Sequence, residues 1–196
     1  MLASSLAWDE ALITKYRAFH KLGTTPRLAI ELVLNIAARR GDLPIIGRQH
    51  LKDGCITWRP SKTSRSTRKV LTIRILPAFQ EALDTMPASS ELAFLLNSHG
   101  RQFASAAAFG NAFANWCAAA GLEPVKCEDG KVRNYRLHGL RKASLIQLAY
   151  DGATGLELLA ISGHKNLSEV QPYIEAAEQK RLMEAVHLKR LAGTKR

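Results

Sequence analysis

Four residues in the C-terminal third of the chain have side chains suited to work on a phosphate ester: His138, Arg141, His164 and Tyr173. His138 and Arg141 are three positions apart, so on a helix they share one face. His164 directly follows a glycine that ends a helical pattern, and Tyr173 comes nine residues later. We expect two tight helical turns to bring the four side chains into one pocket.

Local signals define the helices that hold these residues. Thr154 followed three positions later by Glu157 is the capping-box pattern that starts a helix. Gly163 ends this helix, and Asn166 or Ser168 can cap the next one, which contains the tyrosine. The spacing therefore predicts a rigid platform up to the second histidine and a separate helix for the tyrosine.

Arg39 and Lys62 extend this set to one that suits metal-free attack on a phosphodiester. A tyrosine is a nucleophile once its proton is removed, and two guanidiniums can hold the nonbridging oxygens of the phosphate. A histidine can accept the tyrosine proton or bind the phosphate, and a lysine can protonate the leaving 5′-oxygen. The sequence has neither a GxxxxGK[ST] loop nor a matching carboxylate cluster for Mg²⁺, so we expect no metal and no cofactor. Taken singly, each residue has an ordinary structural explanation as a surface pair, a cap or a packing group.

The bulk composition is that of one globular domain with a basic surface. The chain has 196 residues, 46% of them apolar, and a formal net charge of +11. Such a charge favours a nucleic-acid partner, although a merely cationic surface is the alternative. Three widely spaced cysteines fit a reducing cytoplasm, and no run has the length and apolarity of a membrane span or of a signal peptide.

In the N-terminal part we expect a helix over 9–21 and a second helix that begins with Thr25 as the cap and Pro26 at its first position. Its buried stripe is Leu28, Leu32, Val33, Ile36 and Ala37. Arg39 and Arg40 are expected at its C-terminal end, before a break at Gly41. Asp42 would orient Arg39 or cap the next turn.

A basic hairpin is expected next, with strands over 55–59 and 69–75 and a third strand over 45–51. Its connection is rich in Ser and Thr and is expected to be mobile, with Lys62 on it. The candidates here for contact with a DNA backbone are Arg59, Arg65, Arg68 and Lys69. The alternative is a solvated edge hairpin, because lysines often protect sheet edges.

The rest of the chain is expected to be mainly helical. Helices are predicted from Pro77, over 105–121 and from Tyr173 to about Leu191, with a turn at Gly100. Between them, 122–137 reads as an irregular loop or loose hairpin around Asp129-Gly130. Three further DNA-backbone candidates lie in its second half: Lys131, Arg133 and Arg136.

These motifs together resemble the catalytic domain of the tyrosine recombinases, the phage-integrase family. The resemblance runs from about Thr25 to the C-terminal helix, and its most specific parts are HGLR, GHKNLSEV and the position of Tyr173. It implies an α+β, mainly helical fold with an antiparallel sheet of about three strands, as one catalytic domain over 1–196. Residue by residue, the resemblance assigns as catalytic Arg39, Lys62 (general acid), His138, Arg141, His164 and Tyr173 (nucleophile).

The resemblance also implies an activity and partners. The activity is site-specific cleavage and rejoining of double-stranded DNA through a 3′-phosphotyrosyl intermediate, without ATP. Four protomers would assemble on two DNA sites and exchange a C-terminal helix at about 174–191, while the free protein could be a monomer.

Three departures from the family pattern qualify this reading. Ala37-Ala38 stands where Thr-Gly is frequent, and Pro172 is expected to place Tyr173 in an irregular or mobile segment. The chain has no room for the family's N-terminal DNA-binding domain, so it is read as a fragment or a truncated protein. A non-catalytic DNA-binding remnant and, less favoured, a type IB topoisomerase remain as alternatives.

Overall fold

The computed structural model describes residue 6 and residues 8–61 and 69–193, and it divides the chain into two compact units. The N-terminal unit is Met1–Ser144 and the C-terminal unit is Leu145–Arg196. Each unit is described by itself. In the described part of the chain, no helix is long and apolar enough to cross a membrane.

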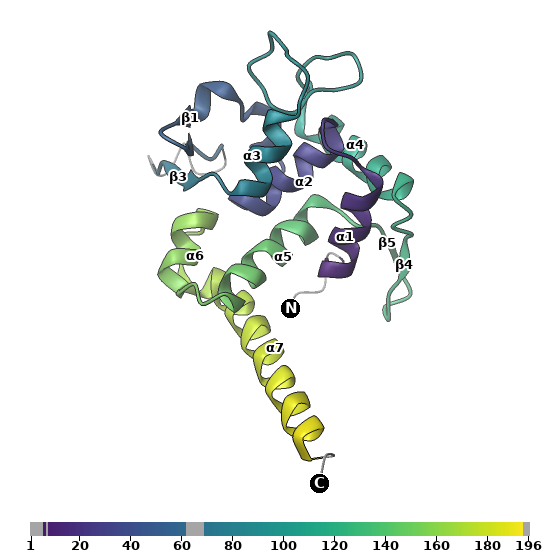
Figure 1. Cartoon of the computed structure of the whole chain (residues 1–196), viewed down its shortest axis with the longest axis vertical. Helices are drawn as coiled ribbons and strands as arrows, with labels where there is room; N and C mark the ends of the chain where they lie inside the picture. The colour runs from purple at the N-terminus through teal and green to yellow at the C-terminus, as the bar shows by residue number, and fades with distance from the viewer. Residues whose placement is uncertain (1–5, 7, 62–68, 194–196) are drawn as a thin grey trace. The chain divides into compact units, whose positions relative to one another are not determined.

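The N-terminal unit is built around one buried helix. Its helices are α1 (Glu10–Phe19), α2 (Thr25–Ile36), α3 (Pro77–Asp84), α4 (Ala106–Ala119) and the first part of α5 (Leu137–Tyr150) (Figure 1). Eight of the twelve residues of α2 are buried, which makes it the centre of the core. Aromatic rings join α1 to α4: the rings of Tyr16 and Phe113 stack with centroids 5.8 Å apart. The predicted helices over 9–21, from Pro77 and over 105–121 are confirmed, with Ser105 as the cap of α4.

The ends of α2 differ from the prediction. Thr24, one residue before the predicted Thr25, occupies the cap position, and the helix ends at Ile36. Ala37 adopts the left-handed conformation with φ +46°, and its N–H donates to the carbonyl of Val33. The chain therefore leaves the helix four residues before the predicted break at Gly41. Alanine rarely adopts this conformation, so the sequence contains no residue at this position that would predict the turn.

A three-stranded antiparallel sheet completes this unit, in the order β1 (Leu51–Lys52), β2 (Cys55–Trp58) and β3 (Leu71–Arg74). Ile56 pairs with Ile73 and Trp58 with Leu71, so alternate residues of β2 enter the core. The predicted strand over 45–51 is largely wrong. Two 3₁₀ turns, η1 (Leu43–Ile45) and η2 (Arg48–His50), fill that stretch, and only its last residue begins a strand.

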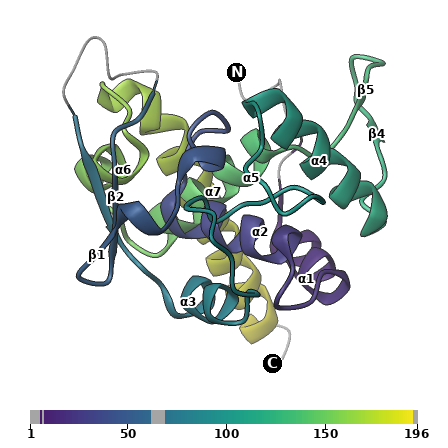
Figure 2. The same ribbon diagram turned by 90° about the horizontal axis from the view of Figure 1, so that it is seen from above.

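The loose hairpin predicted around Asp129-Gly130 is confirmed as the pair β4 (Val125–Lys126) and β5 (Val132–Arg133). Gly130 has φ +74°, which the tight turn requires, and the N–H of Cys127 donates to the carbonyl of Lys131 at 2.9 Å. The three-stranded sheet and this hairpin lie on opposite sides of the N-terminal unit (Figures 1 and 2).

The C-terminal unit contains the end of α5 and the helices α6 (Gly155–Ser162) and α7 (Leu167–Gly193), which pack on each other. The predicted capping box is confirmed: Thr154 and Glu157 bond to each other's backbone N–H groups. α7 begins directly after Asn166 and continues through Pro172. The expected irregular segment at Tyr173 is therefore wrong. Proline deprives the carbonyl of residue 168 of a helical donor, but Ser168 is exposed and water can replace the lost bond.

Candidate active site

Arg141 joins the start of α5 to the turn after α2. Its side chain is buried, with 5% of the residue exposed, and its Nη1 donates to the carbonyl oxygen of Ala37. One turn further along α5, the hydroxyl of Ser144 donates to the carbonyl of Leu34 at 3.0 Å. Both acceptors lie at the end of α2, and Ala37 is two residues before Arg39. The structure thus holds the turn that leads to Arg39 against α5, the helix that carries Arg141.

Asp42 has a role that neither sequence hypothesis named. Its buried carboxylate accepts the backbone N–H of Ser61 at 2.9 Å, while its side chain makes no capping bond to η1. The expectation that it caps the next turn is therefore wrong. The bond fixes the residue that immediately precedes Lys62. Only long-range contact information could have revealed it, because the partners are 19 positions apart.

Three of the predicted hairpin residues, Lys62, Arg65 and Arg68, lie outside the described residues. The other candidates on this connection are at its edges: Arg59 is exposed and Lys69 is half-buried.

His138 is held in a positive environment. It lies at the start of α5, and its pKa is lowered first by partial burial and then by the charges of Lys142 and Arg141. The pKa of Lys142 is itself lowered by burial. A neutral imidazole beside two cations can accept a proton, and it can donate a hydrogen bond to an anion. Sequence reasoning did not single out Lys142, although its spacing of four from His138 on a helix was a usable signal.

The β4–β5 hairpin already carries an internal ion pair. The guanidinium of Arg133 binds the carboxylate of Asp129 through two bonds, one of them 2.9 Å from Nη1 to Oδ1. This contact, with the N–H of Lys131, lowers the pKa of Asp129. A phosphate at Arg133 would compete with this carboxylate for the guanidinium. Lys131 and Arg136, the other candidates here, are exposed.

The C-terminal unit places His164 beside Tyr173. Gly163 ends α6 in the left-handed conformation with φ +67°, and the N–H of His164 donates to the hydroxyl of Ser162 at 3.3 Å. This turn directs the imidazole onto the phenol ring on α7, with ring centroids 6.0 Å apart and planes 23° from parallel. Tyr173 is 7% exposed. The end of α6 at Gly163, which the sequence predicts, thus places the histidine against the tyrosine.

Comparisons with known proteins identify the family and the fold of the chain. The model of the phage integrase family matches residues 10–180, and the chain belongs to that family. A crystal structure of a lambda integrase fragment, a dimer bound to a COC′ core site, superposes with a TM-score of 0.67 at 21% identity over 87% of this chain. The XerA recombinase superposes with a TM-score of 0.72 at 13% identity over 93% of the chain. The Tn1549 transposon integrase, in complex with transposon right-end DNA, superposes with a TM-score of 0.68 at 16% identity over 92% of this chain.

At these identities the superpositions establish the fold: the mainly helical tyrosine-recombinase catalytic domain with its three-stranded sheet. The chain spans 59% of the lambda integrase fragment, 64% of XerA and 66% of the Tn1549 integrase. No curated protein matches the chain by sequence.

Proposed function

We propose that the chain is the catalytic part of a site-specific DNA recombinase that cleaves and rejoins DNA through Tyr173. The observation that carries the proposal is the stacking of His164 on Tyr173, in a family member whose other unit ties Arg141 to the turn before Arg39. Family membership alone would allow an inactive relative. A histidine against the one tyrosine at the nucleophile position, with both arginines present, supports activity.

Tyr173 is the nucleophile in this proposal. Its oxygen attacks the scissile phosphorus, its proton passes to a histidine, and the bond from phosphorus to the 5′-oxygen breaks. Lys62 protonates the departing 5′-hydroxyl, and the DNA is left joined to the protein by a 3′-phosphotyrosine ester. The reverse reaction with a new 5′-hydroxyl rejoins the strand, so the bond energy is conserved and no ATP is used.

Arg39 and Arg141 stabilise the charge on the nonbridging oxygens of the pentacoordinate transition state. Arg141 is suited to this because its Nη1 bond to Ala37 fixes the guanidinium before DNA arrives. His138 adds a donor to the phosphate, and it does so as a neutral imidazole because partial burial and the charges of Lys142 and Arg141 lower its pKa. Preorganised donors of this kind contribute because they need no rearrangement during the reaction.

Double-stranded DNA is the proposed substrate and partner. Exposed basic residues occur in three places of the N-terminal unit: Arg59 directly after β2, Lys131 in the turn between β4 and β5, and Arg136 directly before α5. Contacts of this kind bind phosphates without regard to sequence, so affinity should fall steeply with added salt.

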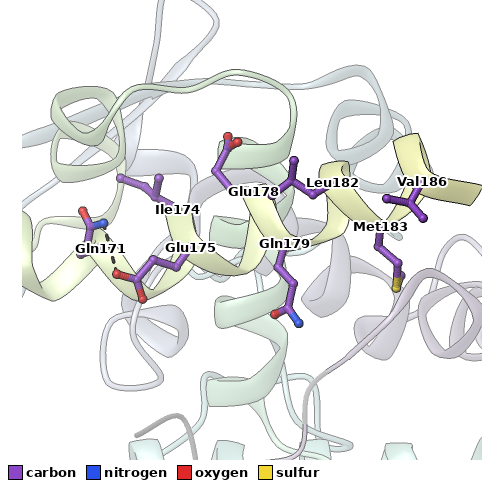
Figure 3. Close-up of a pocket in the computed structure, with 8 residues that line it drawn as sticks. All are labelled: Gln171, Ile174, Glu175, Glu178, Gln179, Leu182, Met183 and Val186. Atoms are coloured by element: carbon purple, nitrogen blue, oxygen red, sulfur yellow. Dashed lines mark hydrogen bonds between the residues drawn. The ribbon is translucent and has the colours of Figure 1, made fainter. Parts of the chain in front are cut away.

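We further propose that α7 is the surface through which protomers assemble on DNA. Four apolar side chains of this helix, Ile174, Leu182, Met183 and Val186, help to line a shallow groove, and Leu182 and Met183 project in different directions from the helix (Figure 3). Leu182 and Met183 are 66% and 67% exposed, which is unusual for neighbouring large apolar side chains. Lambda integrase has been crystallised as a dimer bound to a core site and as a tetramer bound to a Holliday junction.

Covalent capture tests the nucleophile. The protein is incubated with a library of nicked duplexes with randomised cores, and DNA that stays attached in hot detergent is sequenced. Wild type should form an adduct in the presence of EDTA and Tyr173→Phe should form none. Tyr150→Phe, a tyrosine of the same unit outside the site, should still form it. A wild type that binds DNA without forming any adduct would identify a non-catalytic DNA-binding remnant.

Light scattering on a recovered duplex tests the assembly. Wild type should form complexes with more than one protomer, and Leu182→Glu with Met183→Glu should leave one protomer per site. Leu92→Glu, an exposed leucine of the N-terminal unit, is the matched control and should assemble as wild type does. Equal assembly of the α7 variant and the control would exclude α7 as the interface.

A further inference from the structure

The first described residues of the chain cross the beginning of α5. A Cβ atom added to Gly139 would collide with the carbonyl oxygen of Leu6 and would lie 3.2 Å from Cδ1 of Trp8. The obstacle is backbone, so no side-chain rotation removes it. We call Leu6 and Trp8 the N-terminal strap.

Trp8 also binds the carbonyl that starts α5. Its indole Nε1 donates to the carbonyl oxygen of Arg136 at 3.3 Å. The same oxygen accepts the N–H of Gly139 at 3.0 Å and that of Leu140 at 3.2 Å, the first bonds of the helix. The strap thus holds the carbonyl from which the first turn of α5 is built.

The indole is anchored firmly enough for this task. Trp8 is 4% exposed, and its ring makes T-shaped contacts with the rings of Tyr16 and Tyr135 at centroid distances of 5.8 and 5.7 Å. Tyr135 lies just before Arg136, so the ring contact and the hydrogen bond fix the same stretch of backbone.

We infer that the N-terminal strap is a positioning device for the active site, and that Trp8 and Gly139 are positioning residues for His138 and Arg141. This inference rests on the proposed recombinase function. Gly139 follows His138 directly and precedes Arg141 by two residues, so the strap touches the helix between the two proposed phosphate ligands. Glycine is a poor helix former, and its place here is explained by the close approach of the Leu6 carbonyl.

A purely structural role for Trp8, as an anchor of the core, is the competing explanation. Trp116 provides the matched control, because it belongs to the same aromatic cluster through Phe109 and Phe113 but makes no ring contact or hydrogen bond of its side chain to the start of α5 in the described structure. Trp8→Phe and Trp116→Phe both remove an indole from this cluster. Only the first removes the donor to Arg136.

The experiment compares Trp8→Phe, Gly139→Ala and Trp116→Phe in the full chain. NMR titration of the histidine Cε1–H signals, with His138 assigned through His138→Gln, reports on the start of α5 without DNA. Adduct formation on a recovered nicked duplex gives the cleavage rate, and filter binding gives the DNA affinity.

We expect Trp8→Phe and Gly139→Ala to move the titration of His138 up by about 0.3 pH unit or more, toward the ordinary value of about 6.5. Both should slow cleavage roughly 10- to 100-fold, since small misplacements of catalytic groups have effects of this size. DNA affinity should change less than about twofold, because phosphate contacts elsewhere dominate binding. Trp116→Phe should change melting temperature alone.

Equal effects of Trp8→Phe and Trp116→Phe on His138 and on cleavage would overturn the inference, as would no effect of Trp8→Phe on either. If Gly139→Ala does not fold, Trp8→Phe alone still tests whether the strap positions the active site. A wild type without adduct, in which His138 still responds only to the strap variants, would reject the proposed function and leave the strap as the support of this turn.

Discussion

The guanidinium of Arg141 donates to the carbonyl oxygen of Ala37 across 104 positions of sequence. One side chain therefore closes the turn that leads to Arg39 and also belongs to the proposed phosphate site. Its structural bond and its proposed catalytic task depend on the same fixed, forked donor geometry.

On this basis, Arg141→Lys should lower both stability and cleavage, although it is a conservative substitution. Lysine keeps the charge but loses the fork, so the free energy of unfolding should fall by about 1.5–3 kcal/mol, the range for hydrogen bonds to charged groups. Adduct formation should fall at least about 100-fold. Urea unfolding and covalent capture measure the two effects. Arg40→Lys, on an exposed arginine, is the stability control and should unfold like wild type.

Ala37→Gly should stabilise the protein. Ala37 has φ +46°, a conformation that disfavours L-residues by about 1–2 kcal/mol and that glycine adopts freely. Part of this gain is offset by the greater freedom of glycine in the unfolded chain, so we expect a net gain of about 0.5–1 kcal/mol. Ala38→Gly, without positive φ, should be destabilising. A lower unfolding midpoint for Ala37→Gly than for wild type would contradict this explanation of the turn.

Local patterns were sufficient to predict much of the C-terminal unit. The Thr154–Glu157 box and the glycine at 163 specify where α6 begins and ends, because caps act within one turn. The two tight helical turns are expected to bring four side chains into one pocket, and within the C-terminal unit the structure places two of them together, His164 stacked on Tyr173.

Features that depend on distant partners were not predictable in the same way. The end of α2 falls at an alanine held by Arg141, and the sequence pointed instead to Gly41. The bond from Ser61 to Asp42 and the passage of Leu6 over Gly139 join segments that no periodicity relates. Helix continuity through Pro172 reflects packing of α7, which overrides the local preference of proline.

Stability should fall as the solution is acidified below about pH 6.5, the ordinary histidine pKa. The pKa values of His20, His50 and His138 are all lowered, first by burial. Between each lowered pKa and the ordinary value, the unfolded chain binds more protons than the folded one, so the free energy of unfolding decreases with falling pH. His20 is buried and its Nε2 bonds to the carbonyl of Trp116 at 2.9 Å, which requires the proton on Nε2.

His20→Gln tests this dependence, because glutamine can still donate to that carbonyl but does not titrate. Denaturant unfolding between pH 5 and 7.5 should give a shallower decline for this variant. Parallel stability curves for wild type and His20→Gln would show that His20 is not a source of the pH dependence.

The middle of α7 should be loosened by Arg181→Met. The guanidinium of Arg181 donates to the carbonyls of Ala149 and Tyr150, which end α5, and the hydroxyl of Tyr150 donates to Glu184. Arginine at such carbonyls caps a helix C-terminus, and the loss should be about 1 kcal/mol for this partly exposed group. Hydrogen exchange should therefore quicken about fivefold in α7 and stay unchanged in α4. Uniform quickening in both helices would instead indicate global destabilisation.

Asp42→Ala should release the residue that precedes Lys62. Asp42 is 1% exposed and accepts the N–H of Ser61 at 2.9 Å, so its removal leaves a donor that water must satisfy. Exchange of the Ser61 amide should quicken, and adduct formation should slow by roughly tenfold because the proposed general acid loses the fixed start of its segment. Asp42→Asn retains an amide oxygen as acceptor and should preserve both the protection of Ser61 and most of the rate. Rapid exchange at Ser61 with an unchanged cleavage rate in Asp42→Ala would show that the anchor serves the fold alone.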